Sequence, residues 1–230
     1  ETGRWGDPKQ EWYRGLAVAA LKADRPEAAE PALARMIERY ADDPQAWYLM
    51  YQFAVGSQDY RQAAIALTVT GYLRPLTEAE YSQLGDIYAS LGVPCLSVDA
   101  YRAALPEDPD PLQYEKLVSA TLAAHDLDGA LSALDRALAA QATPRLYSLL
   151  GDVHYRQRDY AAAREAFARV IELDPDYTRA HLMVGYCSLE LGDRDQALDS
   201  LGRVVDDPDH GTVAQLLIQR AMKLEGDQAS

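Results

Sequence analysis

The stretch "PRLYSLLGDVHYRQRDYAAAREAFARVIELDP", residues 144–175, decides the fold because its pattern recurs along the whole chain. Within it Leu150 and Gly151 are adjacent, and Ala163, Phe167 and Pro175 follow at fixed distances. Copies with this spacing begin at six residues: Gln10, Pro44, Glu78, Pro111, Pro144 and Thr178. Successive starts are 34, 34, 33, 33 and 34 residues apart. A fixed period of this length is the signature of a repeat architecture.

Three positions of the repeat keep their residue type in all six copies. The seventh is a large apolar residue: Leu16, Met50, Leu84, Leu117, Leu150 and Val184. The twentieth is small: Ala29, Ala63, Ser97, Ala130, Ala163 and Ala197. The twenty-fourth is apolar or aromatic: Leu33, Leu67, Tyr101, Leu134, Phe167 and Leu201. Apolar residues at helical spacing in each half predict two helices per repeat, and the small residue lets them approach closely.

A turn-forming residue separates the two halves of every copy. These residues are Asp24, Asp59, Gly92, Asp126, Asp159 and Gly192. Asp and Gly are typical of the points where one helix ends and the next begins. The first helix of each repeat should therefore stop, and the second begin, at this residue.

The recurring residues resemble the tetratricopeptide repeat, whose pattern is written with Trp, Leu-Gly, Tyr, Ala, Phe and Pro. The fifth copy matches it at Tyr147, Leu150, Gly151, Ala163, Phe167 and Pro175. The second copy matches it at Trp47, Ala63 and Pro75. Tyr51 and Val118 depart from it, because they occupy a position that usually holds a small residue, and we expect wider or shifted helix pairs there. His154 stands where Tyr is usual.

The resemblance implies an all-α fold, a right-handed superhelical solenoid of helix-turn-helix repeats. The six repeats would span 10–43, 44–77, 78–110, 111–143, 144–177 and 178–210. Residues 211–225 are predicted as a capping helix, because the end of such an array needs a cover. Residues 1–9 are interpreted as a tail, either a vector scar or the product of signal-peptide removal, and residues 226–230 as a frayed tail.

In this family, one face of the first helix of each repeat lines the concave groove of the superhelix. The resemblance implies a partner-binding groove lined by Tyr48, Gln52, Val55, Gln83, Asp86, Lys116, Ser119, Asp152, Tyr155, Arg156, Leu182 and Tyr186. A surface with aromatic ends and a polar middle suits an extended peptide or a helix with a few apolar anchors. The ninth position lacks the Asn and Lys that hold a C-terminal carboxylate in chaperone-binding relatives. We therefore expect no affinity for acidic chaperone tails.

The stretch "AWYLMYQFAV", residues 46–55, is apolar on more than one side of its predicted helix. The spacing gives this helix two apolar faces. One faces the core, and the other carries Tyr48, Leu49, Gln52 and Val55. Two interpretations stay open for the second face: it lines the groove, or neighbouring helices or a second copy of the chain bury it.

Composition excludes several classes of function. The net charge of -14 and the pI near 4.6 disfavour a nucleic-acid partner, because phosphate binding needs clustered Lys and Arg. No apolar run approaches the roughly 20 residues of a membrane-spanning helix, so we expect no membrane insertion. Hydrophobic residues make up 48% of the chain, which is typical of a folded protein.

The sequence offers no pattern for catalysis, and we predict that the chain is not an enzyme and holds no metal or cofactor. His154 and His181 fall on core-type positions, which predicts packed neutral side chains, and His125 and His210 fall in turns. The acidic stretch "VVDDPDHG", residues 204–211, lacks the spacing of a calcium loop and predicts a turn. Cys95 and Cys187 are predicted to be free thiols, because three stacked repeats would separate them.

These features predict a non-catalytic scaffold that binds a peptide or helical segment of a partner protein in its concave groove. An acidic surface favours a partner with a basic flank. The alternative is a small-molecule or lipid binding protein, in which Tyr48, Gln52 and Val55 wall a closed apolar pocket. Both are compatible with a monomer or a homodimer.

The stretch "LGDIYASLGVPCLSVDAYRAAL", residues 84–105, resembles bacterial periplasmic members of the family that accompany envelope systems. Together with the leading "ETG", it favours a periplasmic or otherwise exported protein, with a cytoplasmic location as the alternative.

Overall fold

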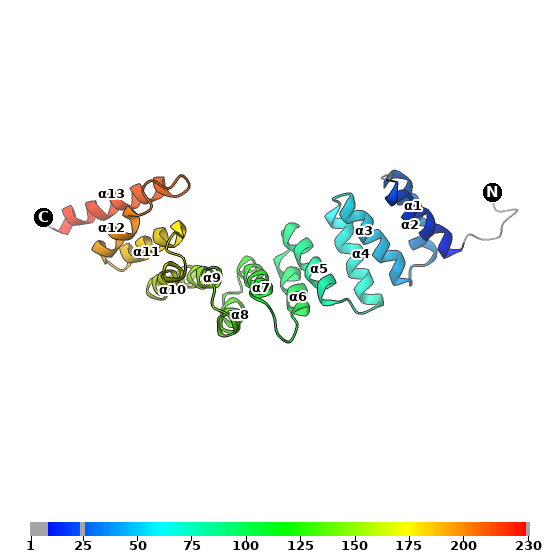
Figure 1. Cartoon of the computed structure of the whole chain (residues 1–230), viewed down its shortest axis with the longest axis horizontal. Helices are drawn as coiled ribbons and strands as arrows, with labels where there is room; N and C mark the ends of the chain where they lie inside the picture. The colour runs from blue at the N-terminus through cyan, green and yellow to red at the C-terminus, as the bar shows by residue number, and fades with distance from the viewer. Residues whose placement is uncertain (1–8, 24–25, 229–230) are drawn as a thin grey trace. The chain divides into compact units, whose positions relative to one another are not determined.

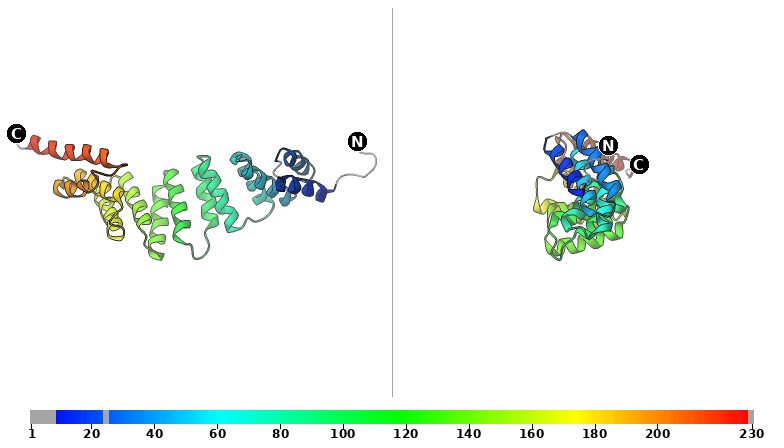
Figure 2. Two further views of the ribbon diagram at one scale, coloured as in Figure 1. Left: turned by 45° about the horizontal axis from the view of Figure 1, so that its top comes forward. Right: turned by 90° about the vertical axis from the view of Figure 1, so that its right-hand side faces the viewer.

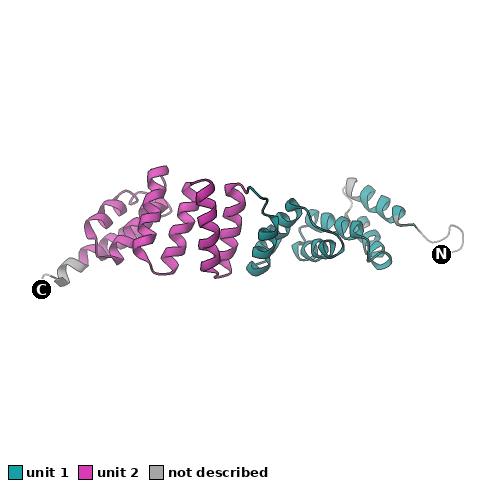
Figure 3. Cartoon of the chain, turned by 90° about the horizontal axis from the view of Figure 1, so that it is seen from below, with its two compact units in different colours: residues 1–108 teal, residues 109–230 magenta. Residues whose placement is uncertain are grey.

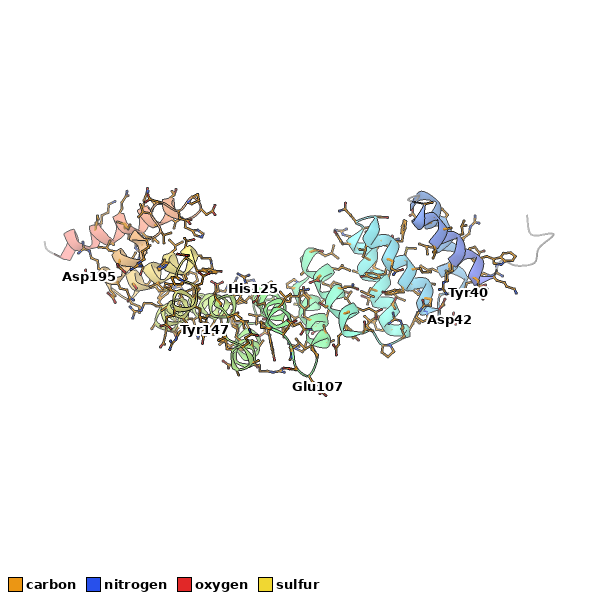
Figure 4. The ribbon with its side chains drawn as sticks, in the orientation of Figure 1. Tyr40, Asp42, Glu107, His125, Tyr147 and Asp195 are labelled. Atoms are coloured by element: carbon orange, nitrogen blue, oxygen red, sulfur yellow. The ribbon has the colours of Figure 1, made fainter. Side chains whose placement is uncertain are left out.

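A computed structural model describes residues 9–23 and 26–228, which form thirteen helices and no strand (Figure 1). The chain divides into two compact units, residues 1–108 and residues 109–230 (Figure 3). The boundary falls in the segment 105–110, where Pro106 and Pro109 interrupt helix formation. Glu107 lies in this segment (Figure 4). The all-helical fold class is confirmed, and each unit is described by itself below.

Unit 1 contains α1 (Gln10–Lys22), α2 (Pro26–Arg39), α3 (Pro44–Gly56), α4 (Tyr60–Leu73), α5 (Glu78–Ser90) and α6 (Pro94–Ala104). Unit 2 contains α7 (Pro111–Ala123), α8 (Leu127–Ala140), α9 (Pro144–Arg156), α10 (Tyr160–Leu173), α11 (Thr178–Glu190), α12 (Arg194–Gly202) and α13 (Gly211–Gln228). Each expected repeat start is the first residue of an odd-numbered helix. The expected tails lie outside the described residues, except Lys9 and the last turn of α13, which continues to Gln228.

The Asp residues between the halves begin the second helix of their repeats by capping it. The carboxylates of Asp59, Asp126, Asp159 and Asp193 accept hydrogen bonds from backbone N–H groups in the first turns of α4, α8, α10 and α12. Such a cap satisfies a donor that the helix itself leaves unpaired. Asp24, the turn residue expected in the first repeat, stands one position earlier in its repeat and lies outside the described residues.

The fifteenth residue of the repeat, which directly precedes the N-cap of the second helix, has a left-handed backbone in the second to sixth repeats. Its φ is 58° at Gln58, 70° at Gly92, 59° at His125, 61° at Arg158 and 79° at Gly192. This conformation ends the first helix, because it lets the following N–H groups bond back to the last carbonyls. Only two of the five residues are glycine, so three repeats accept the steric cost of a side chain here.

The two helices of each repeat meet at the small twentieth residue, which is 0% exposed in all six repeats. Gly85, Gly151 and Gly185 allow the same close approach from the first helix. A Cβ added at Gly151 would lie 2.7 Å from the ring of Phe167. In the second repeat the sizes are exchanged: Tyr51 stands at the position of Gly151, and the smaller Leu67 stands at the position of Phe167.

Neighbouring repeats within a unit pack their apolar side chains against one another. In unit 2, α9 to α12 pack in sequence, and α13 covers α12 and contacts α11 (Figure 2). At the start of unit 1, Leu16 is 56% exposed although its equivalents in later repeats are mostly buried. Leu16 therefore lies largely outside the apolar core of unit 1. Across residues 9–23 and 26–228, no helix is both long and apolar enough to cross a membrane.

Candidate partner-binding site

The predicted groove residues lie on first helices, on α3 and α5 in unit 1 and on α7, α9 and α11 in unit 2. The exposed members are Gln52, Val55, Gln83, Asp86, Ser119 and Arg156. The partly buried members are Tyr48, Lys116, Asp152, Tyr155, Leu182 and Tyr186. The exposed members can meet a partner directly, whereas most of the others are held by contacts inside their unit.

The second face of α3 divides between the core and the surface. Leu49 is 9% exposed and belongs to the unit 1 core with Ala17 and Ala20 of α1. Gln52 and Val55, one and two turns further on, are exposed. The apolar stretch 46–55 therefore owes much of its character to burial by the preceding repeat, and only its C-terminal half offers a free surface.

Tyr48 is fixed in place by two neighbours. Its ring centroid lies 5.5 Å from that of Tyr51, and the Arg74 guanidinium lies 5.4 Å from the Tyr48 ring centroid. Arg74 donates through both terminal nitrogens to the Glu80 carboxylate, at 2.8 and 2.6 Å. Tyr48 thus forms part of a stack that joins α3 to α5, and its ring cannot move freely toward a ligand.

Glu80 is the charged centre of this stack and is only 8% exposed. Its carboxylate also accepts the backbone N–H of Thr77, in a capping box at the start of α5. The hydrogen bonds from Arg74 lower the pKa of Glu80 to about 2, against the opposing effect of burial. The carboxyl group therefore stays ionised in the folded protein well below the pH at which it would protonate in an unfolded chain.

On α5, both predicted groove residues accept a hydrogen bond from a core tyrosine. The Tyr51 hydroxyl donates to Gln83 Oε1 at 2.9 Å, and the Tyr101 hydroxyl donates to Asp86 Oδ1 at 2.7 Å. Burial and the Asp86 carboxylate raise the pKa of Tyr101. The tyrosines orient these two polar side chains while leaving them exposed.

In unit 2, arginines connect neighbouring first helices across the predicted surface. Arg179 of α11 donates to Asp152 of α9 at 2.5 Å and to the Ser148 hydroxyl at 2.9 Å. Arg156 of α9 donates to the Leu122 carbonyl of α7 at 2.9 Å. These bonds fix the spacing of three first helices and leave a polar surface along them.

Three tyrosines pack together where α9 meets α11. The Tyr155 and Tyr186 ring centroids are 5.4 Å apart with an edge-to-face geometry, and Tyr160 lies 6.2 Å from each. Burial, and then the hydrogen bond with Tyr155, raise the pKa of Tyr186 to about 12. Because the rings already contact one another, they form a rigid aromatic wall.

Leu182 lies at the covered end of the surface. It packs against a core of α11, α12 and α13 that includes Leu201, Val204 and Ala214. Leu217 and Ile218 of the capping helix pack against the same core. Leu182 is therefore partly withdrawn from a partner, whereas Ser119 on α7 is exposed.

Sequence reasoning missed three residues that organise these surfaces: Arg74, Tyr160 and Arg179. Arg74 lies in the connection after α4, and Tyr160 begins a second helix, so neither occupies a groove position of the repeat. Arg179 occupies the second position of its repeat, which faces the ninth position of the preceding one, Asp152. That opposite-charge pair was readable from the sequence once the register was known.

The histidines and cysteines differ in their burial. His181 is 7% exposed with Nε2 2.8 Å from the Pro175 carbonyl, and His125 lies in the α7–α8 turn (Figure 4). Cys95 is exposed and Cys187 is buried, both as free thiols, and burial raises the pKa of Cys187 to about 11. Within the described parts of the chain, no three His, Cys, Asp or Glu side chains group as a metal site.

Two cavities lie at equivalent positions of the second and fifth repeats, away from the predicted groove. The cavity of the fifth repeat, about 220 Å³, is lined by residues of α9 and α10 that include Tyr147, His154 and Arg169. The cavity of the second repeat, about 380 Å³, lies among α2, α3 and α4 and includes Trp47 and Ile65. Tyr147 of the smaller cavity is labelled in Figure 4.

Family comparison agrees with this architecture. The sequence pattern described as "Tetratricopeptide repeat" matches residues 8–50, 116–178 and 148–210, more than half of the chain. The chain belongs to the tetratricopeptide repeat family. Such repeats are protein-interaction scaffolds, which present extended binding surfaces built from stacked helix pairs. No curated protein sequence matches the chain.

Solved tetratricopeptide-type structures share the fold at low sequence identity. MamA is 20% identical with a TM-score of 0.63, over 74% of this chain and 93% of its own. YrrB, described as "a TPR protein with an unusual peptide-binding site", is 20% identical with a TM-score of 0.62, over 84% and 98%. PilW, described as a "widely conserved type IV pilus biogenesis factor", is 13% identical with a TM-score of 0.58, over 94% and 100%. At these identities the likeness concerns the fold alone.

Proposed function

We propose that this tetratricopeptide repeat protein is a non-catalytic scaffold that binds a peptide or helical segment of a partner protein along its first helices. The observation that carries the proposal is the fixed polar and aromatic surface of α7, α9 and α11. Arg156, Asp152 and Arg179 connect these helices, and Tyr155 and Tyr186 form a wall beside them. A surface already ordered before binding loses less conformational entropy when a partner arrives.

The chemistry of this surface suits a polar segment with a few apolar anchors. Ser119, Asp152 and Arg156 offer hydrogen-bonding groups, while the tyrosine wall offers a flat contact of the kind that often dominates binding energy. The net charge of -14 favours a partner with a basic flank. The peptide-binding site named in the description of YrrB supports the same class of ligand for this fold.

The alternative of a closed apolar pocket at the second repeat gains less support. Its expected walls included Gln52 and Val55, and both side chains are exposed on α3. Tyr48, the third expected wall, is engaged by Arg74 and Tyr51. An open surface at these residues favours a segment of a partner protein over an enclosed small molecule.

The test is selection of binders from a random peptide library displayed on phage, followed by affinity measurements with matched variants. Ser119 on α7 and Ser132 on α8 are both exposed, and only Ser119 occupies a groove position. We expect Ser119→Trp to weaken the selected peptides tenfold or more, because a tryptophan would obstruct the surface. Ser132→Trp is the matched control and should leave the affinity unchanged.

Two further results would bear on the proposal. Selected peptides should be rich in Lys and Arg, and their binding should weaken as the salt concentration rises. Equal loss of binding in both serine variants, or none in either, would show that the first helices are not the binding surface.

The exported location stays a prediction, which cell fractionation of the native host would test.

A further inference from the structure

The second repeat carries a cavity on a face that the proposed groove does not use. The cavity of about 380 Å³ is lined by Ile37 and Glu38 of α2, Trp47 and Met50 of α3, Gln62 and Ile65 of α4, and two alanines. On α3, Trp47 and Met50 lie about 140° around the helix from Gln52 and Val55, at 3.6 residues per turn. The two surfaces of α3 can therefore be occupied independently.

Two residues of the cavity wall, Trp47 and Met50, are held in place by contacts within unit 1. The indole Nε1 of Trp47 donates to the Ala41 carbonyl at 2.8 Å, which fixes the ring. Met50 is 6% exposed and held in the core of unit 1. Pockets for small molecules have volumes of about 300–1,000 Å³, so the cavity of about 380 Å³ has room for one large apolar side chain.

An exposed apolar stripe extends from the cavity along α4. Ile65 is 60% exposed, Val69 is partly exposed, and Tyr72 is 85% exposed. Their spacing of four and three residues places them on one face of the helix, over about 10 Å. After Arg61, α4 contains no charged residue. Such an aligned exposed stripe differs from the single apolar residues that any protein surface carries.

The fifth repeat shows that this apolar chemistry is not required by the repeat itself. At the positions of Ile65 and Val69 it has Glu165 and Arg169, which line its smaller cavity. Both repeats therefore have a cavity at this position, but only in the second repeat are the residues that its own two helices contribute to the lining all uncharged.

Charge at the α2 side of the cavity indicates what kind of segment fits. Glu38 is the only charged residue of the lining, and Asp42 follows it in the α2–α3 turn (Figure 4). None of the ion pairs found among residues 9–23 and 26–228 involves Glu38. A Lys or Arg beside an apolar anchor would complement this edge, and the net charge of -14 would attract it.

We propose that α2, α3 and α4 form a second docking site, which takes an amphipathic helix of a partner protein. The helix places one large apolar side chain in the cavity and others along Ile65, Val69 and Tyr72. A Lys or Arg on the same helix pairs with Glu38. Recognition through apolar residues spaced one and two turns apart is a common way in which grooves bind helices.

The test uses a synthetic helical peptide with Leu, Phe and Leu at positions i, i+4 and i+7 and Lys on its flanks. A second peptide has Glu in place of Lys, and a third has Gln in place of the apolar residues. Trp47 reports binding in a Trp5→Phe, Trp12→Phe background, where it is the remaining tryptophan. We expect the Lys peptide to change Trp47 fluorescence and to bind at least tenfold more tightly than the other two.

Variants on exposed positions separate the two proposed sites. Ile65→Glu should weaken the Lys peptide tenfold or more, and Glu38→Lys should shift the preference toward the Glu peptide. Ser119→Trp, on α7, should leave this binding unchanged. Circular dichroism melts of Ile65→Glu and Glu38→Lys should match that of the parent protein, because both side chains are exposed.

Three outcomes would overturn the proposal. Absence of binding by the Lys peptide up to about 1 mM would show that this site does not bind such a helix. Binding that persists in Ile65→Glu would place the peptide elsewhere. A dimer in light scattering that Ile65→Glu converts to a monomer would identify a second copy of the chain as the occupant.

Discussion

The second and fifth repeats share one backbone arrangement, but the second carries few charged side chains and the fifth carries many. In residues 44–77 the charged side chains are Asp59, Arg61 and Arg74. Residues 144–177 carry charges along both helices, among them Arg156 and Glu165. Both repeats cap their second helix with Asp and turn through a left-handed residue at the same position.

The comparison separates what the fold needs from what an individual repeat adds. Caps, the small twentieth residue and the left-handed turn recur because the helical hairpin depends on them. Charge on the outer faces is free to vary, and the second repeat has no charged residue on α3 and only Arg61 on α4. Since solvated apolar surface contributes nothing to folding, its concentration in one repeat favours an interface there.

The largest expected difference is in the stability lost when each of two arginines that bridge neighbouring repeats is replaced by Met. Arg74→Met should cost about 2–3 kcal/mol, because it leaves the Glu80 carboxylate largely buried without its partner. Arg179→Met should cost about 1 kcal/mol or less, because Arg179 and Asp152 are both more exposed to water. Urea unfolding of each variant gives the two free energies.

The two units can be followed separately in this experiment. All three tryptophans lie in residues 1–108, so their fluorescence reports unit 1, whereas reactivity of the buried Cys187 thiol reports unit 2. Glu80→Gln serves as the control, since it removes the charge that Arg74→Met would strand. Equal costs for the two arginine variants would show that burial does not distinguish the two ion pairs.

The Arg74–Glu80 pair predicts an acid-sensitive junction between the second and third repeats. The folded-state pKa of Glu80, about 2, lies below the ordinary value of 4.5. A lowered carboxyl pKa stabilises the fold above pH 4.5, and this contribution, up to about 3 kcal/mol, is lost as the pH falls toward 2. Tryptophan-monitored urea melts between pH 6 and pH 2.5 should show the loss in the parent protein. In Glu80→Gln the decline should be smaller over this range, and an identical decline would contradict the assignment.

The sequence predicted the hairpins well because their determinants are local. The small twentieth residue and Asp59-type caps act within a few residues of their own position, so their spacing indicates each helix boundary. The groove face was harder, because Leu49 and Leu182 are covered by helices from another part of the chain. The cavity beside Trp47 needs three helices to form, and no single stretch of sequence indicates it.

Packing between the two helices gives the next effect in size. Gly151→Ala should destabilise unit 2 by about 1–3 kcal/mol, because the new methyl group meets the fully buried ring of Phe167. Phe167→Leu introduces the residue type found at Leu67 in the second repeat and should relieve part of this cost in the double variant. A double-mutant cycle followed by Cys187 reactivity measures the coupling, expected to be about 1 kcal/mol.

Gly15 supplies the matched control for this pair. A Cβ at Gly15 meets nothing within 4 Å, so Gly15→Ala should stabilise α1 by about 0.5–1 kcal/mol. Additive effects of Gly151→Ala and Phe167→Leu would mean that these two positions do not set the distance between the helices.

The smallest expected effect tests the feature that the two repeats share. Gln58 and Arg158 hold a left-handed backbone with φ of 58° and 61°, where glycine stands in the third and sixth repeats. Gln58→Gly and Arg158→Gly should each stabilise the protein by about 0.5–1 kcal/mol, because relief of the steric cost exceeds the added entropy of the unfolded chain. Gly92→Ala should have the opposite sign. Because the turn depends only on local backbone geometry, the two gains in stability should be equal although the surfaces of the two repeats differ. Unequal gains would show that the side chains on the repeat surface affect the stability of the turn.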